Sequence, residues 1–133
     1  MSENLDLVRS ILAAWERGDY RSADWAHPEI EYAMVDGPEP GRWKGLAEMA
    51  EAARKGLDAW KDIRFEIEEY RELDDERVLV LHHASGSGKA SGLELGQMRT
   101  NAAHLFHLRR GKVTRLVNYW DRERALADLG FKE

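Results

Sequence analysis

The sequence predicts an α+β fold in which helices precede a curled antiparallel sheet, within one domain spanning residues 1–133. In the first half, apolar residues recur at intervals of three and four, which is the helical period, whereas the second half carries long runs that alternate as strands do. We find no internal repeat and no linker. Hydrophobic residues make up 43% of the chain and charged residues 34%, which excludes a disordered chain.

Two helices are predicted at the start of the chain. The first covers residues 4–18 and ends at Gly18, and its apolar stripe consists of Leu5, Val8, Ile11, Leu12 and Trp15. A short second helix is predicted over residues 19–28, where Pro28 closes it.

A strand over residues 29–35 follows, with one apolar face made of Ile30, Tyr32 and Met34. Residues 36–45 hold two prolines and three glycines and are predicted to form an irregular loop before a helix over residues 46–60. The remainder is predicted as two hairpins and a closing helix: strands over residues 63–73 and 78–85, a flexible glycine-rich connection over residues 85–96, strands over residues 97–110 and 112–121, and a helix over residues 122–129.

Composition narrows the classes of function. The net charge is -5 and no basic block is present, so nucleic acid is not an expected partner. The absence of cysteine excludes disulfides, zinc–thiolate sites and thiol nucleophiles. The N-terminus lacks the basic start and apolar run of a signal peptide, and no apolar segment approaches the roughly 20 residues that span a bilayer. We therefore expect a cytoplasmic protein without membrane contact.

Four stretches together carry a resemblance to a known family: "ERGD" at the end of the first helix, "HPEIEY" at the first strand, "DGPEPGRWKG" before the third helix, and the C-terminal "RRGKVTRLVNYWDRERALADLG". In this order they resemble the nuclear-transport-factor-two-like superfamily, which includes ketosteroid isomerase, limonene epoxide hydrolase and the SnoaL-like polyketide cyclases. The resemblance implies a cone-shaped sheet wrapped around the N-terminal helices, with a central apolar pocket. Isomerases, hydrolases, cyclases and plain ligand binders share this fold, so it does not specify function.

The register of the last hairpin decides which residues face the predicted pocket. A short turn at Arg110-Gly111 pairs Arg109 with Lys112, Leu105 with Leu116, and Ala103 with Asn118. Because side chains alternate across a sheet, one face then carries Thr114, Leu116, Asn118 and Trp120, with Asn101, Ala103, Leu105 and His107 on the neighbouring strand. The resemblance to ketosteroid isomerase implies that this face lines the cavity.

Two aspartates are candidate catalytic acids. On the chosen parity, Asp121 points away from the cavity and caps the last helix, unless a strand bulge turns it inward. Asp36 resembles the catalytic base of ketosteroid isomerase, although an aspartate before glycine is also ordinary turn chemistry. The oxyanion donors of that isomerase correspond to Ile11 and Ala103, which cannot donate a hydrogen bond. Asn118 resembles a catalytic aspartate of limonene epoxide hydrolase and can orient a substrate oxygen, but it cannot take a proton.

The histidines offer a second source of proton transfer. His107 is a candidate general base on the predicted pocket face. Neighbours along a strand diverge, so His82 and His83 cannot both enter one site, and a metal would need one histidine from each strand plus a carboxylate. We therefore expect neither metal nor cofactor.

These observations predict a SnoaL-like protein that binds a compact, apolar molecule and acts as a cofactor-free isomerase, cyclase or lyase. The predicted catalytic residues are Asp36, His107 and Asn118, and the predicted substrate-binding residues are Trp15, Tyr32, Met34, Asn101, Ala103, Leu105, Leu116 and Trp120. The alternatives are a non-catalytic ligand binder or sensor, and a protein–protein adaptor. A homodimer is expected through the outer sheet face, with Phe106, Val113, Val117 and Tyr119 at its surface.

Overall fold

The computed structural model describes residues 3–17, 19, 24–36, 40–58, 60–88 and 97–130. This part of the chain contains the helices α1 (Glu3–Glu16), α2 (Leu46–Asp58) and α3 (Arg122–Asp128). Its strands are β1 (Ala26–Met34), β2 (Gly41–Lys44), β3 (Trp60–Glu72), β4 (Arg77–Gly88), β5 (Gln97–Arg109) and β6 (Lys112–Tyr119).

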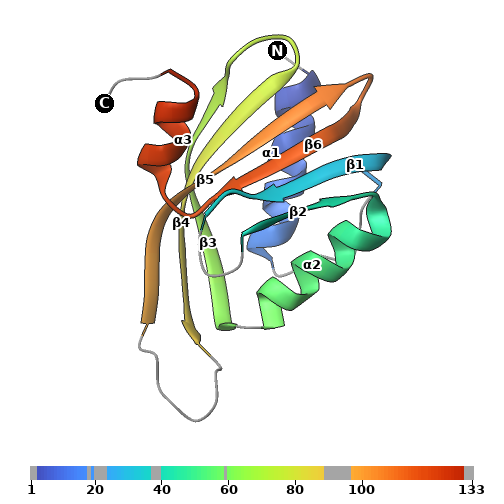
Figure 1. The fold of residues 1–133 in the computed structure, drawn as a ribbon. Helices are drawn as coiled ribbons and strands as arrows, with labels where there is room; N and C mark the ends of the chain where they lie inside the picture. The colour runs from blue at the N-terminus through green and yellow to red at the C-terminus, as the bar shows by residue number, and fades with distance from the viewer. Residues whose placement is uncertain are drawn as a thin grey trace.

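The strands form one open sheet in the order β2-β1-β6-β5-β4-β3 (Figure 1). Neighbouring strands are antiparallel except β1 and β6, which run parallel and join the two halves of the chain. The predicted α+β class is confirmed, and the sheet is mixed rather than purely antiparallel. We call the face packed against α1 and α2 the inner face, and the face packed against α3 the outer face.

Both faces of the sheet are apolar, and each is covered by helices. On β4, Val78 and Val80 point to the inner face and Leu79 and Leu81 to the outer face, which explains the continuous apolar run of this strand. The inner core adds Val8, Ile11 and Leu12 of α1, Met49 of α2 and Phe106 of β5. The outer core adds Ala103, Leu105, Val117, Tyr119 and, from α3, Ala125 and Leu126. Burying each large aliphatic side chain stabilises the fold by about 1.5–3 kcal/mol.

Several predicted elements differ at their ends. The short helix over residues 19–28 is wrong at its C-terminal end, because Ala26–Pro28 belong to β1; residues 20–23 lie outside the described residues. Residues 41–44, predicted as loop, form β2 against β1. Gly45 then turns the chain with a φ of 91°, a conformation that favours glycine, and its N–H donates to Ile30 O. The glycine-rich connection begins later than predicted, because β4 extends to Gly88, and residues 89–96 lie outside the described residues.

The hairpin of β5 and β6 contains a bulge that the sequence did not reveal. Its turn is as predicted: Arg110 and Gly111 have φ values of 53° and 76°, and Arg109 pairs with Lys112. Beyond Leu108 and Val113, however, the pairing skips Thr114, which donates from Oγ1 to His107 O at 3.3 Å. Every later pair is shifted by one residue.

The shift corrects the predicted pocket face. Phe106 pairs with Leu116, His104 with Asn118, and Ala103 with Tyr119, so the predicted pairs of Leu105 with Leu116 and Ala103 with Asn118 are wrong. Four residues predicted to share the face of Asn118 lie instead on the outer face: Asn101, Ala103, Leu105 and His107. Ala103 and Leu105 pack there beneath α3.

The residues predicted to form the dimer surface are buried within the chain. Phe106 and Val113 are fully buried in the inner core, and Val117 and Tyr119 are covered together with Ala125 and Leu126 of α3. The assignment of these four residues to an exposed dimer surface was therefore wrong. The homodimer itself stays a prediction.

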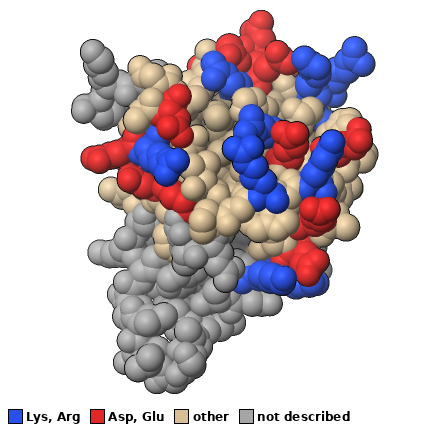
Figure 2. Space-filling view, in the orientation of Figure 1, with Lys and Arg blue, Asp and Glu red and all other residues tan. Residues whose placement is uncertain are grey.

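Charges of both signs are interspersed over the face of the molecule shown in Figure 2. Within the part of the chain that the structure describes, no helix has the length and apolar character needed to cross a membrane.

Candidate functional site

A cluster of polar side chains lies on the inner face, where the rest of the surface is apolar. Three neighbouring strands supply it: β1 carries Tyr32 and Met34, β6 carries Asn118, and β5 carries His104. Asn118 is central, because it is directly opposite His104 on one side and Met34 on the other. With His82 of β4, these residues form what we call the inner-face cluster.

The cluster is joined by hydrogen bonds of defined direction. Asn118 Nδ2 donates to Tyr32 Oη at 2.9 Å and lies 3.4 Å from Met34 Sδ. Asn118 Oδ1 is therefore the partner of His104 Nδ1. An amide oxygen only accepts, so His104 Nδ1 carries the hydrogen and the neutral imidazole has its lone pair on Nε2. Tyr32 Oη in turn donates to Met34 Sδ at 3.6 Å.

Aromatic rings surround His104 and restrict its orientation. The imidazole of His82 stacks on it with 4.2 Å between centroids and an interplanar angle of 11°. Trp15, near the end of α1, meets it edge to face at 5.4 Å and 74°, and Phe106 lies 6.2 Å away. Only 2% of His82 and 7% of His104 is exposed, so both rings are desolvated. Trp15 and Asn118 are half-buried and form the more accessible part of the site.

Burial keeps these titratable groups neutral near pH 7. It lowers the pKa of His104 to about 4, although the hydrogen bond that His104 donates to Asn118 opposes the change. Burial also lowers the pKa of His82 to about 2, assisted by the charge that His104 carries once it is protonated and by the charge of Arg122. The pKa of Tyr32 is raised to about 12 by burial, against the effect of its hydrogen bond with Asn118. A neutral ligand would therefore meet hydrogen-bonding groups rather than charges.

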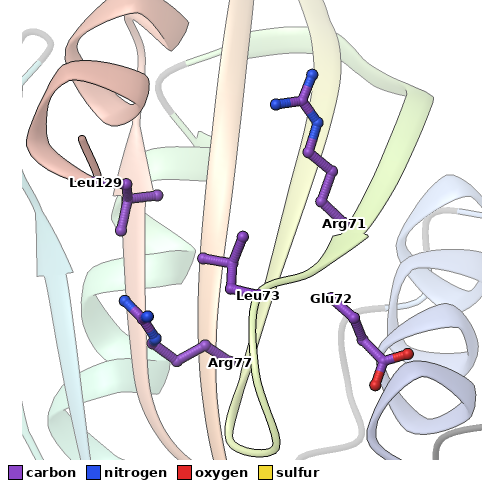
Figure 3. Close-up of a pocket in the computed structure, with 5 residues that line it drawn as sticks. All are labelled: Arg71, Glu72, Leu73, Arg77 and Leu129. Carbon is purple, nitrogen blue, oxygen red and sulfur yellow. The ribbon is translucent and has the colours of Figure 1, made fainter. Parts of the chain in front are cut away.

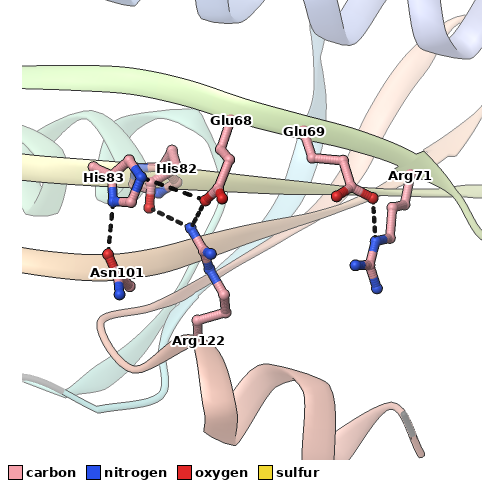
Figure 4. A network of polar contacts seen from close by, with 7 residues as sticks. All are labelled: Glu68, Glu69, Arg71, His82, His83, Asn101 and Arg122. Atoms are coloured by element: carbon pink, nitrogen blue, oxygen red, sulfur yellow. Dashed lines mark hydrogen bonds and ion pairs between the residues drawn. The ribbon is translucent and has the colours of Figure 1, made fainter. Parts of the chain in front are cut away.

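A second polar network fastens α3 to the outer face behind this cluster (Figure 4). Arg122 Nη2 contacts Glu68 Oε2 at 2.6 Å and donates to the backbone carbonyl of His82 at 3.3 Å. Glu68 lies at a bulge of β3, and its pKa is lowered chiefly by the hydrogen bond from Arg122. His83 contacts Glu68 through Nε2 at 3.4 Å and Asn101 through Nδ1 at 2.6 Å. Arg122, the first residue of α3, thus binds the backbone of His82, and it is the ring of His82 that stacks on His104.

The two candidate aspartates meet at the junction of β6 and α3. Asp36 accepts hydrogen bonds from the backbone N–H groups of Trp120 at 2.6 Å and Asp121 at 3.2 Å. Asp121 Oδ1 accepts from Glu123 N at 3.0 Å, which confirms it as the N-cap of α3. In this arrangement the Asp36 carboxylate fastens the end of β1 to the start of α3. Its catalytic role stays a prediction.

The other predicted site residues are divided between the two faces. Trp15, Tyr32, Met34 and Leu116 belong to the inner core or pack against it, and Trp120 is half-buried at the end of β6. His107 lies on the outer face, where burial and the nearby Arg115 and Arg77 lower its pKa. Among the described residues, no three histidine, aspartate or glutamate side chains converge as metal ligands would.

His104 and His82 are the residues that the sequence interpretation missed. A signal was present in "VTRLV": two consecutive polar residues, Thr114 and Arg115, separate the apolar Val113 and Leu116 and interrupt strict alternation. Such a pair of polar residues is what a bulge produces when both flanking apolar residues must point inward.

The class of protein is an α+β fold with an open sheet and a polar cluster on the inner face. Comparison with known proteins identifies the family. The model of the SnoaL-like domain matches residues 8–116, so the chain belongs to that family. This confirms the resemblance to the nuclear-transport-factor-two-like superfamily. No curated protein sequence matches the chain.

Solved structures share the fold at low sequence identity. An NTF2-like protein of unknown function from Burkholderia pseudomallei is 18% identical, with 96% of this chain and 97% of that chain covered and a TM-score of 0.76. TerC, co-crystallised with polyporic acid, is 21% identical, with 96% and 98% covered and a TM-score of 0.73. A protein with a ketosteroid isomerase-like fold from Catenulispora acidiphila, in complex with trimethylamine, is 14% identical, with 95% and 93% covered and a TM-score of 0.71. These likenesses show the fold alone.

Proposed function

We propose that this protein binds a compact, neutral, largely apolar molecule at the inner-face cluster and catalyses a cofactor-free proton transfer with His104 as the base. The observation that carries the proposal is the hydrogen-bond chain from His104 through Asn118 to Tyr32. The ligand complexes of TerC and of the Catenulispora acidiphila protein support a small-molecule site in this fold.

The proposed reaction begins at a C–H group beside a carbonyl. His104 Nε2 takes the proton, and the electron pair of the C–H bond moves to the carbonyl oxygen. Asn118 Oδ1 continues to accept from Nδ1 and so stabilises the imidazolium that forms, as does the face of the adjacent aromatic rings. Where a C=C bond adjoins that carbon, the electron pair returns from the oxygen through the conjugated system and the imidazolium delivers the proton to the far carbon of that bond, which completes an isomerisation and restores the neutral histidine.

Tyr32 is the proposed donor to the developing oxyanion. Its hydroxyl donates to Met34 Sδ at 3.6 Å, and a thioether sulfur is a weak acceptor. A substrate oxygen would be a stronger acceptor, and the N–H of Asn118 already polarises the hydroxyl. Asn118 thus positions both the base and the donor, while Trp15 and Leu116 supply apolar contact.

The test is the exchange of carbon-bound hydrogen in 2-tetralone, a compact ketone, followed by proton NMR in D2O. The protein should accelerate exchange by about 10²–10⁴-fold, the usual contribution of a positioned acid or base. His104→Asn keeps an N–H toward Asn118 but lacks the Nε2 lone pair, and should lose the acceleration. His27→Asn, at the start of β1, keeps the acceptor for Glu29 N and should behave as the wild type. An active His104→Asn variant would remove His104 from the mechanism.

One observation favours a second function, that of a non-catalytic binder or sensor. A histidine whose pKa is lowered to about 4 is a weak base, and the cluster then serves mainly to hydrogen-bond a neutral ligand. A binder would shift the NMR signals of Trp15 and His104 on addition of 2-tetralone without accelerating exchange.

We also propose that the protein forms a homodimer and is located in the cytoplasm. Light scattering in solution gives the mass of the assembly, and the mass of one chain would contradict the dimer. Fractionation of the source cells tests the location.

A further inference from the structure

A pocket of about 460 Å³ lies on the other side of the molecule from the inner-face cluster, between the end of α3 and the turn that joins β3 to β4. Its lining residues are Arg71, Glu72, Leu73, Arg77 and Leu129. In Figure 3, the two arginines lie on either side of Leu73, and Glu72 points away from Leu129. The volume is within the roughly 300–1,000 Å³ of small-molecule sites. The pocket thus combines an apolar surface with two guanidinium groups.

A row of basic side chains continues from this pocket across the outer face. Arg77 of β4 pairs with His107 of β5, which pairs with Arg115 of β6, so three basic residues are neighbours on adjacent strands. Strands are about 4.8 Å apart, so each arginine is a direct cross-strand neighbour of the imidazole. An anion beside His107 would therefore be near both guanidinium groups.

The surroundings of His107 show which sign of charge dominates there. Burial is the main cause of its lowered pKa, and the positive charges of Arg115 and Arg77 come next, ahead of the opposing Asp74 and Glu76. Arg115 and Arg77 therefore act on the imidazole more strongly than the two acids do.

Arg77 and Arg115 each contact an acidic side chain, but these contacts do not use all of their N–H groups. Arg77 contacts Asp74 through Nε at 2.8 Å, and the Nε of Arg115 lies 3.9 Å from Glu31. A guanidinium has five N–H donors, so contact through Nε does not exhaust it. Arginine is also suited to bidentate pairing with a carboxylate.

We propose that this pocket binds a compact molecule that combines one carboxylate with an apolar body. The carboxylate pairs with Arg77 and faces His107 and Arg115, and the apolar body packs on Leu73 and Leu129. The lining holds two arginines and one glutamate, which suits a single carboxylate, and the two leucines provide a reason for an apolar body. This site is independent of the proton-transfer function proposed for the inner face.

Octanoate is a suitable probe, with acetate and 1-octanol as matched probes that carry only the charge or only the apolar chain. Titrations followed by NMR should show saturable binding of octanoate, with shifts at Arg77, His107 and Leu129. Acetate and 1-octanol should each bind at least about tenfold more weakly. Bound octanoate should also raise the pKa of His107, because the anion favours the imidazolium.

Variants locate the site. Arg77→Gln should weaken octanoate binding by about tenfold or more, and Arg115→Gln provides an independent test should Arg77→Gln fail to fold. Arg54→Gln removes a charge from the exposed side of α2 and should bind as the wild type does. His104→Asn should also bind octanoate normally, which separates this site from the inner face. Octanoate shifts confined to Trp15 and His104, or unchanged affinity in both Arg77→Gln and Arg115→Gln, would overturn the proposal.

Discussion

The neutral state of His104 should make the protein sensitive to acid. Burial lowers the pKa of His104 from 6.5 to about 4, whereas the unfolded chain keeps the ordinary value. As the pH falls, the unfolded state takes up a proton first, so the stability contributed by the neutral ring is full above pH 6.5 and is lost as the pH approaches 4. At about 1.4 kcal/mol per pH unit, the difference between the two pKa values corresponds to about 3 kcal/mol.

His104→Asn isolates this contribution. The variant keeps an N–H near the position of Nδ1, so Asn118 Oδ1 retains its donor, but the side chain no longer titrates. It should be less stable than the wild type at pH 7, because the smaller side chain leaves space in the core. Between pH 7 and pH 4, however, its free energy of unfolding should fall by about 3 kcal/mol less than that of the wild type.

Urea unfolding at a series of pH values, followed by tryptophan fluorescence, measures both quantities. His82, whose pKa is lowered to about 2, still titrates on unfolding, so the variant should retain part of the acid sensitivity. His27→Asn is the matched control and should keep the full pH dependence of the wild type. If His104→Asn lost as much stability as the wild type on acidification, the argument that His104 is buried in its neutral form would be wrong.

Three further predictions concern neighbouring groups. Asn118→Asp places a carboxylate beside Nδ1 and should raise the pKa of His104 by roughly 1–3 units, measured by NMR titration of its ring protons; no rise would contradict the contact. Asp121→Ala should lower the free energy of unfolding by about 1 kcal/mol because α3 loses its cap, whereas Asp121→Ser should retain most of that stability; equal urea midpoints would argue against capping. Tyr32, with a pKa raised to about 12, should contribute no phenolate absorbance at pH 10, so Tyr32→Phe and the wild type should coincide there.

The helices and the long strands could be predicted from the sequence, because the local spacing of apolar residues determines which segments form them. The stripe that ends at Trp15 predicted α1, and alternation predicted the long strands. An aspartate directly before a charged, alanine-rich segment predicted the N-cap of α3. Asp121 is that N-cap, and its side chain accepts a hydrogen bond from Glu123 N. The parallel pairing of β1 with β6 has no local signal, since it depends on residues some 80 positions apart in the chain.

The sequence predicted only some of the residues of the inner-face cluster, and the bulge at Thr114 explains why the others were missed. Asn118 lies beside Tyr32 and Met34 on the inner face, as its parity indicated. The bulge at Thr114 then exchanged the faces of β5 relative to the expected register, so His104 rather than Ala103 lies opposite Asn118. Register is highly sensitive to such an insertion, because a shift of one residue moves every side chain to the opposite face.

The parallel contact between β1 and β6 has a consequence for how the chain reaches its native state. β1 has only the short β2 on its other edge, so its main partner is a strand that is synthesised much later than β1 itself. Closing so large a loop early is entropically unfavourable, and folds built on distant pairings form slowly. On a ribosome, β1 must therefore wait, with one edge exposed, until β6 has been synthesised and has emerged. Truncation within β6 would release β1 as well as β6, so a deletion that removes β6 should produce an aggregating chain rather than a smaller folded domain.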